Sequence, residues 1–323
     1  AAYIDALGDA SAVRYGDLPD PVAGTGQVLV RVDAVAVNHV DTFLRSGRWR
    51  SPVSFPLVLG RDLVGTVTAV GAGVTGVQPG QRMWTNSAGY AGRPGATAER
   101  VVVDRDRLYP LPAGADPVAF VAAVHPGATA HGVLVGRARL RAGETVAVVG
   151  ANGSVGMCLV QVAAACGAEV VAVVREGRGG DRLRSLGAHR VVVAVGVEVP
   201  ATLDGADVVV DASGRADLTG VEKRLNPRGR VVLVAGRGHL RLDMWRLYTR
   251  EIQILGFVMS AMTVPELAAA ARWINESHSR RPLSVEVGLV AGFADAADAH
   301  ATVESGRLPH SAEGIVGRIV LRP

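Results

Sequence analysis

The segment 144–174 constrains the fold more than any other, because strand, turn, helix and strand patterns follow one another within it. Residues 145–149 form a short apolar run rich in β-branched side chains, which is typical of a strand buried on both faces. A glycine-rich turn follows, and from Ser154 apolar residues recur at helical spacing until Gly167 ends the helix. Residues 169–174 are a second strand of the buried type. The segment therefore predicts a βαβ unit of a parallel sheet.

The turn of this unit has the composition of a dinucleotide-binding loop. Only glycine lets the backbone approach a pyrophosphate closely, and the helix start offers free N–H groups and the positive end of its dipole. We expect these residues to hold the coenzyme: Gly150, Asn152, Gly153, Ser154, Val155 and Gly156. One alternative is a glycine-tolerant junction that binds nothing. The other is a transmembrane helix over the uncharged residues 145–168, against which the glycines argue.

Bulk composition indicates a soluble protein with two domains. The chain has 323 residues, of which 49% are hydrophobic and 20% charged. The net charge is +4, but the arginines are scattered, which disfavours nucleic-acid binding. Cys158 and Cys166 are separated by about 12 Å on the predicted helix, too far for a disulfide. The first residues lack a basic segment and an apolar run, so we expect a cytoplasmic protein without a membrane anchor.

Two kinds of strand pattern divide the chain. Residues 27–35, 63–70 and 100–103 are short strands between glycine- and proline-rich turns, which indicates an antiparallel, barrel-like first domain. From residue 143 strands alternate with helices, as in a doubly wound parallel sheet. The strands expected there are 146–149, 170–174, 191–193, 208–211, 231–234 and 252–258. A helix should begin near 263–266, and a last strand at 315–321 should return to the first domain.

Several motifs along the chain resemble, in the same order, the landmarks of one enzyme family. Residues 36–47, AVNHVDTFLRSG, resemble the substrate-side signature of the quinone oxidoreductase (zeta-crystallin-like) branch of the medium-chain dehydrogenase/reductase superfamily. Further landmarks look similar at 59–65, 70–74, 127–130, 150–156 and 317–321.

The resemblance implies an α/β fold with two domains. A GroES-like β-barrel catalytic domain (1–122 and 266–323) would be split around a Rossmann domain with a doubly wound parallel sheet (123–265). It also implies a cleft between the domains and a homodimer.

The end of the second strand of the βαβ unit bears on the choice between NAD and NADP. A carboxylate there binds the ribose hydroxyls of NAD, whereas here Val174 is followed by Arg175, with Arg178 in the next loop. Guanidinium groups bind a 2′-phosphate bidentately, so we expect NADPH. Glu176 could instead accept from the ribose or pair with Arg175, and these charges could also be solvated surface groups. Five further residues are expected to line the coenzyme: Thr129, Ala212, Gly214, Ala235 and Gly236.

We expect no metal site. Zinc takes Cys, His or carboxylate ligands. The resemblance implies that zinc-dependent relatives carry a Cys at the position of Asn38 and a His–Glu pair at that of Arg61 and Asp62. No cysteine cluster lies between residues 80 and 103. Three potential ligands remain near the expected cleft, and such residues more often make ordinary hydrogen bonds: His39, Asp41 and His125.

Without a Lewis acid, hydride transfer suits acceptors that spread charge by conjugation, such as quinones and enones. We expect Asn38 to donate to the acceptor's carbonyl oxygen and Asp41 to orient Asn38 or the nicotinamide. His39 would either supply a proton or pack at a strand end.

An aromatic wall is expected beside these residues. Relatives carry a tyrosine shortly after the glycine at Gly47, as a proposed proton donor, where this chain has Trp49. Indole cannot act as an acid near neutral pH, so Trp49 is expected to stack on a flat acceptor. Weaker candidates for the same wall are Trp84, Tyr90 and Phe257.

The sequence therefore predicts an NADPH-dependent, zinc-free reductase of quinones or other conjugated carbonyls, with a small-molecule substrate and no membrane partner. One alternative is a pathway-specific enoyl or enone reductase of secondary metabolism. Another is an NADPH-binding structural or RNA-binding protein of the zeta-crystallin type with little catalysis.

Overall fold

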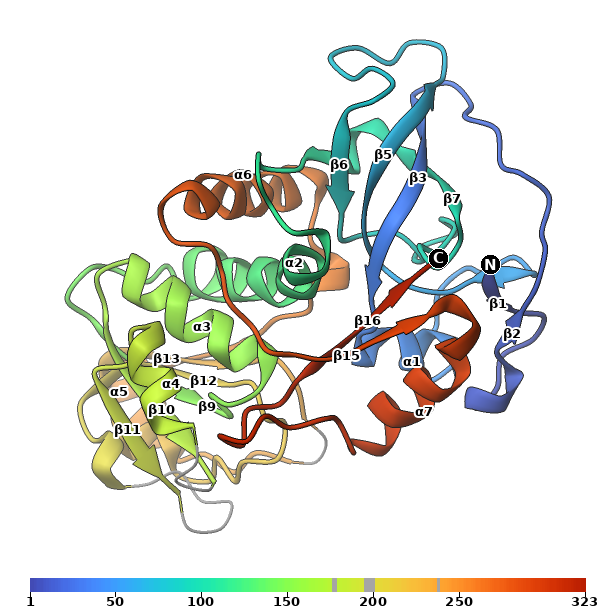
Figure 1. Ribbon diagram of the computed structural model, residues 1–323. Helices are drawn as coiled ribbons and strands as arrows, with labels where there is room; N and C mark the ends of the chain where they lie inside the picture. The colour runs from blue at the N-terminus through green and yellow to red at the C-terminus, as the bar shows by residue number, and fades with distance from the viewer. Residues whose placement is uncertain (176–178, 195–200, 237–238) are drawn as a thin grey trace. The chain divides into compact units, whose positions relative to one another are not determined.

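The computed structural model describes residues 1–175, 179–194, 201–236 and 239–323. The chain forms two compact units (Figure 1). Unit 1 comprises Ala1–His125, Thr263–Pro309 and Gly317–Pro323, and unit 2 comprises Pro126–Met262 and His310–Val316. The domain boundaries expected from the sequence lie close to these breaks, although residues 310–316 group with unit 2.

Unit 1 contains the mainly antiparallel sheet expected from its short strands. The strand order is β15-β16-β3-β5-β6-β8, and β7 also pairs with β3. The strands are β3 (Gln27–Ala36), β5 (Asp62–Val70), β6 (Arg82–Thr85), β7 (Arg100–Asp104), β8 (Tyr109–Pro110), β15 (Val287–Gly292) and β16 (Arg318–Arg322). A second small sheet joins β1 (Ala2–Ile4), β2 (Arg14–Tyr15) and β4 (Leu57–Val58). Alternate residues of β3 are buried because Val28, Val30 and Val32 point into the core of this unit.

The last strand returns to the first domain, as predicted. β16 pairs antiparallel with β3, with Val320 opposite Ala36. β3 in turn pairs antiparallel with β5, with Ala36 opposite Asp62. This register places the carboxyl end of β3, the start of β5 and the start of β16 side by side, although they are far apart in sequence.

Among the described residues, three α-helices belong wholly to unit 1: α1 (His39–Arg45), α6 (Val264–Arg280) and α7 (Ala296–Ser305). Helix α6 begins where the sequence predicted, because Thr263 and Glu266 form a reciprocal cap: the Thr263 N–H donates to the Glu266 carboxylate over 2.8 Å. Helix α1 uses the same arrangement, in which the Asn38 N–H donates to the Asp41 carboxylate over 2.8 Å.

Helix α2 (Pro117–His131) contains Pro126 and continues as a π-helical segment, Gly132–Arg137. Among the described residues, 117–137 is the one helical stretch long and apolar enough to cross a membrane, and 78% of its most apolar window is buried in the protein. That burial is typical of a core helix of a globular domain.

Unit 2 contains a six-stranded parallel sheet, as predicted (Figure 1). Its order is β11-β10-β9-β12-β13-β14, so the winding direction reverses between β9 and β12, as in a doubly wound fold. The strands are β9 (Thr145–Val149), β10 (Glu169–Val174), β11 (Arg190–Val193), β12 (Ala206–Asp211), β13 (Leu225–Leu233) and β14 (Gln253–Gly256). The α-helices are α3 (Ser154–Ala165), α4 (Gly180–Leu186) and α5 (Met244–Thr249). Cys158 and Cys166 are both free thiols, as their spacing predicted.

Helix α1 is fixed to α7 by a buried charge. The fully buried Arg45 guanidinium pairs with Glu304, and His300 on the same helix is also buried. Burial, together with the positive charge of Arg45, lowers the pKa of His300 to about 3. The imidazole is therefore neutral at neutral pH.

Acid should weaken the fold partly through His300. Below its ordinary value of 6.5 the unfolded chain takes up a proton that the folded state does not accept until about pH 3, so stability falls across that interval. We expect the free energy of unfolding to fall less steeply with acid in the His300→Gln variant. Urea denaturation at a series of pH values measures this slope. The exposed His239 provides the control, since His239→Gln should keep the wild-type slope; identical slopes for all three proteins would contradict the prediction.

Candidate active site

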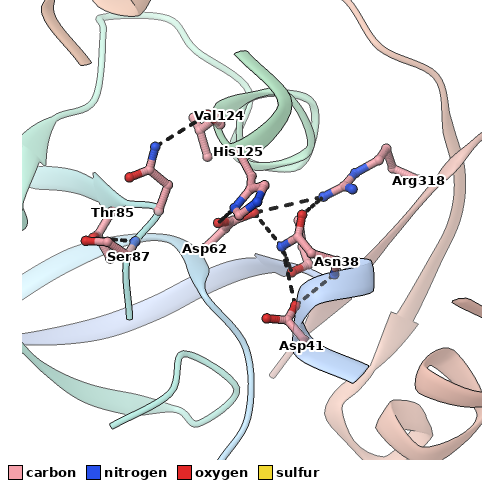
Figure 2. A network of polar contacts seen from close by, with 10 residues as sticks. Asn38, Asp41, Asp62, Thr85, Ser87, Val124, His125 and Arg318 are labelled. Atoms are coloured by element: carbon pink, nitrogen blue, oxygen red, sulfur yellow. Dashed lines mark hydrogen bonds and ion pairs between the residues drawn. The ribbon is translucent and has the colours of Figure 1, made fainter. Parts of the chain in front are cut away.

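A cluster of buried polar side chains occupies unit 1 at the place where β3, β5 and β16 meet (Figure 2). Asn38 lies just beyond β3 and caps α1, Asp62 begins β5, and Arg318 begins β16. Asp41 comes from the first turn of α1 and His125 from α2. The strand register described above is what brings the first three residues together.

Asn38 is held by hydrogen bonds on both sides of its amide. Its Nδ2 donates to Asp62 Oδ2 over 2.8 Å and to Asp41 Oδ2 over 3.3 Å. Its Oδ1 accepts from Arg318 Nη2 over 2.8 Å. The residue is only 3% exposed. The expected contact between Asp41 and Asn38 is present, but the expectation that Asn38 donates to a substrate is wrong for this arrangement, because its amide hydrogens already have acceptors.

Asp62 is the centre of the cluster. It is fully buried, accepts from Asn38, lies 3.2 Å from His125 Nδ1 through Oδ1, and lies 3.9 Å from Arg318 Nη2 through Oδ2. A buried carboxylate needs partners of this kind, because removal from water otherwise disfavours its charge strongly.

The pKa shifts show how closely these charges interact. Burial raises the pKa of Asp41 to about 7, with help from the negative charge of Asp62 and against the positive charge of Arg61. Burial lowers the pKa of Arg61, and the negative charges of Asp41 and Asp62 oppose that shift. Burial also lowers the pKa of His125, which is therefore neutral at neutral pH, even though Asp62 opposes the shift.

The residues at the positions of the family's zinc ligands do not fit a zinc ion. Asn38 is hydrogen-bonded through both amide atoms, and Arg61 carries only N–H donors, which cannot ligate a cation. Arg61 and Arg318 already supply positive charge beside the carboxylates of Asp41 and Asp62. In the part of the chain that the structure describes, no group of three or more His, Cys, Asp or Glu residues is arranged to hold a metal.

Two of the predicted wall residues lie together beside this cluster. The rings of Trp49 and Tyr90 meet edge to face, with centroids 6.2 Å apart. The Arg61 guanidinium carbon lies 4.7 Å from the centroid of the Tyr90 ring. Both aromatic residues are half-buried, so solvent reaches them as well.

The other two wall candidates have packing roles. Trp84 is fully buried, donates from Nε1 to Asn275 over 3.1 Å and packs on Tyr109 and Phe120, so the prediction that it lines a substrate wall is wrong. Phe257 belongs to unit 2, where it is buried against Gly132; a Cβ on that glycine would lie 2.6 Å from the Phe257 ring.

His39 does not pack at a strand end. It is the first residue of α1 and is exposed. A role in catalysis for this residue stays a prediction.

In unit 2 the turn after β9 has the geometry that a pyrophosphate requires. Gly150 has a φ of +80°, and a Cβ on Gly156 would lie 2.2 Å from the Gly150 carbonyl oxygen, so both positions need glycine. Gly153 is the N-cap of α3 and supplies no capping side chain. A Cβ there would meet nothing closer than 3.5 Å. The first N–H groups of α3, at Ser154, Val155 and Gly156, are thus not covered by a cap, and the residues fit a dinucleotide.

The loops after β12 and β13 meet at the same edge of the sheet. A Cβ on Gly214 would lie 2.7 Å from the Gly236 nitrogen, next to Ala235. The Asp211 carboxylate fixes the first loop by accepting from the N–H groups of Ser213 and Gly214 over 2.8 and 3.2 Å. Ala212 is held by a hydrogen bond from its N–H to the Val149 carbonyl, over 3.0 Å.

The remaining coenzyme candidates that the structure describes lie at the end of β10, in α2 and in the turn after β9. Val174 ends β10 and is buried, and Arg175 follows it as an exposed residue. Thr129 is buried in α2. Asn152 lies in the turn, and its carbonyl accepts from the Val316 N–H over 3.4 Å. Glu176 and Arg178 lie outside the described residues.

Sequence reasoning did not assign site roles to Asp62, Arg318 or Asp211. The pair Arg61–Asp62 was visible as a departure from the zinc-ligand pattern. For Asp211 the signal was an aspartate at a strand end followed by Ala-Ser-Gly, which is typical of a side chain that caps its own turn.

Removing the central charge should destabilise the protein strongly. In the Asp62→Asn variant the shape is kept, but the Arg318 guanidinium loses its paired anion and Arg61 loses one of the two carboxylates that offset its charge. We expect a loss of about 3–5 kcal/mol in the free energy of unfolding, measured by chemical denaturation. Asp20 forms an exposed pair with Arg100, so Asp20→Ala should lose only about 0–1 kcal/mol. Similar losses in both variants would show that the cluster is not electrostatically important.

Comparison with known proteins agrees with this architecture. Residues 24–113 match the family described as "Alcohol dehydrogenase GroES-like domain", and residues 154–276 match "Zinc-binding dehydrogenase". The quinone oxidoreductase of Sus scrofa is 30% identical over 314 residues, which cover 94% of this chain and 92% of that protein. That of Mus musculus is 29% identical over 313 residues, with the same coverage. The solved structure of mycobacterial Rv1454c complexed with NADPH is 26% identical, with a TM-score of 0.82 over 100% of this chain and 99% of that one.

These matches extend over nearly the whole length of the chain and of its relatives, and they agree with the two-unit fold. The family is one of oxidoreductases that bind a nicotinamide coenzyme. The chain therefore belongs to the quinone oxidoreductase branch of the medium-chain dehydrogenase/reductase superfamily.

Proposed function

We propose that this protein is an NADPH-dependent reductase that transfers hydride to quinones or other conjugated carbonyl compounds without a metal. The observation that carries the proposal is the charge-compensated cluster around Asp62. At the positions of the family's zinc ligands, it contains guanidinium groups and a fully engaged amide. A protein without a Lewis acid stabilises an alkoxide poorly, whereas a conjugated acceptor spreads the incoming charge over its own atoms.

The coenzyme supplies the hydride, and the chain's contribution is to bind and orient. The uncapped start of α3 would take the pyrophosphate, because its N–H groups and helix dipole favour an anion. The cluster in unit 1 would act as a rigid surface beneath the acceptor, since the hydrogen bonds among Asn38, Asp62 and Arg318 restrict the movement of these side chains.

The preference for NADPH rests on the end of β10. Buried Val174 offers no carboxylate to the ribose, and the exposed Arg175 offers a guanidinium to a 2′-phosphate. The mycobacterial relative complexed with NADPH agrees with this choice.

Replacing Arg175 should separate the two coenzymes. Hydrogen bonds to charged groups contribute about 1.5–3 kcal/mol each. We therefore expect Arg175→Ala to raise the Kd for NADPH about ten- to thousand-fold and to leave the Kd for NADH nearly unchanged. Titration calorimetry measures both. Arg190 begins β11 opposite Val171, toward the amino end of β10, whereas Arg175 follows the carboxyl end of β10. Arg190→Ala therefore removes the same charge away from the expected 2′-phosphate and should change neither Kd. Equal weakening of both coenzymes by Arg175→Ala would remove the argument for NADPH.

A panel of acceptors tests the reaction itself. We expect the purified protein to oxidise NADPH, followed by absorbance, with quinones and with enones, and to do so unchanged after exhaustive treatment with a chelator. Turnover confined to a narrow group of enones or enoyl thioesters would favour the pathway-specific reductase. Tight NADPH binding without turnover on any acceptor, or strong salt-dependent RNA binding, would favour the structural or RNA-binding alternative.

A further inference from the structure

Reduction of an enone needs a proton as well as a hydride, and four residues in and beside the cluster of unit 1 are poorly suited to give one. Asn38 has no acidic proton. His125 faces Asp62 and is neutral at neutral pH, because burial lowers its pKa. Asp41 is 2% exposed and accepts from Asn38. The indole of Trp49 cannot act as an acid near neutral pH.

Tyr90 is the half-exposed acid of this group. Its ring meets Trp49 edge to face, and Arg61 lies over its face at 4.7 Å. No residue in the described part of the chain hydrogen-bonds to its hydroxyl group. The phenol therefore keeps its donor available for a bound molecule, in a place that solvent also reaches.

The loop that carries Tyr90 is fixed by hydrogen bonds that its backbone N–H groups donate on both sides of the residue. The Ala88 N–H donates to the Arg61 carbonyl over 3.1 Å, and the Ala91 N–H donates to Ser51 Oγ over 3.0 Å. A Cβ on Gly89 would lie 2.6 Å from the Gly60 carbonyl oxygen, so the loop is seated closely on the segment that precedes β5. These contacts hold Tyr90 next to Arg61 and hold the segment after Trp49 next to Tyr90.

Arg61 suits the step that follows loss of the proton. A cation over an aromatic face is attracted by the electrons of the ring. A cation that is removed from water also stabilises negative charge on the ring more strongly. Arg61 meets this condition, because it is only 3% exposed. The positive charge of Arg61 is itself held in place by Asp41 and Asp62.

We propose that Tyr90 is the proton donor to the reduced acceptor, with Arg61 as its positioning residue; this rests on the function proposed above. Hydride adds to the β-carbon of an enone and forms a C–H bond, and the electron pair of the C=C bond moves into an enolate. The O–H bond of Tyr90 then breaks, and its proton forms the second C–H bond at the α-carbon. The tyrosinate regains a proton from water. A quinone needs no proton from the enzyme, because its hydroquinone anion is protonated by water.

The test compares two acceptors in the Tyr90→Phe variant, which keeps the ring against Trp49 and Arg61. With 2-methylcyclohex-2-enone we expect kcat to fall about 10²-fold or more. With phenanthrenequinone it should change less than about 3-fold, a factor that corresponds to less than one hydrogen bond. Tyr109→Phe is the matched control, because Tyr109 is buried in the core of unit 1, and both activities should be retained. Calorimetry should give an unchanged Kd for NADPH in both variants.

The stereochemistry of the product gives a readout that a purely structural role would not change. The wild-type protein should protonate the α-carbon from one face and give 2-methylcyclohexanone with a large enantiomeric excess. Tyr90→Phe should give nearly racemic product, because water protonates both faces. Trp49→Tyr combined with Tyr90→Phe should restore both the rate and the excess, since the two rings are in contact.

Three results would overturn the proposal. They are an equal loss with both acceptors, an unchanged enantiomeric excess in Tyr90→Phe, and loss of the excess in Asp41→Asn instead. A wild-type protein that reduces neither acceptor would remove the proposed function and the role of Tyr90 with it. Reduction of the quinone together with an unchanged excess would remove only the role of Tyr90.

Discussion

The site in unit 1 depends on one buried carboxylate, that of Asp62. An anion without water is stable only when donors and opposite charge surround it. Here Asn38, His125 and Arg318 meet that need, each from a different element of the chain. The antiparallel register of β3 with β5 and β16 delivers two of the three, so the sheet and the site depend on the same alignment. A shift of that register by one residue would separate charges as well as core side chains.

The two units form their candidate binding sites from different groups. Unit 1 arranges charged side chains, and their positions depend on contacts between distant segments. Unit 2 uses backbone geometry: the turn at Gly150 and the uncapped start of α3 present N–H groups whatever the surrounding side chains are. This difference explains why a local motif identifies the second site, while the first site becomes visible only in three dimensions.

Local patterns predicted most of the fold. Three kinds of pattern were sufficient for this, because each depends only on neighbouring residues. They are the alternation along β3, the apolar runs of β9 and β10, and the helix cap at Thr263. Strand β13 was predicted to begin at Val231 but begins at Leu225, because proline and glycine obscure its first half. The contacts of the site in unit 1 were harder to predict from the sequence. Arg318 and Asn38 are hydrogen-bonded although 280 residues separate them, and Trp84 donates to Asn275, which lies 191 residues further along the chain. Contacts between such distant residues cannot be predicted from local sequence spacing.

The compensated cluster also restricts how this sequence can diverge. Asn38, Asp62 and Arg318 each satisfy a buried partner, so a change at one of them leaves a donor or a charge stranded in the interior. Most proteins have only about 5–15 kcal/mol of net stability, and residues in one network affect one another non-additively. The three positions are therefore an epistatic set, in which a substitution at one position is tolerated only together with changes at its partners.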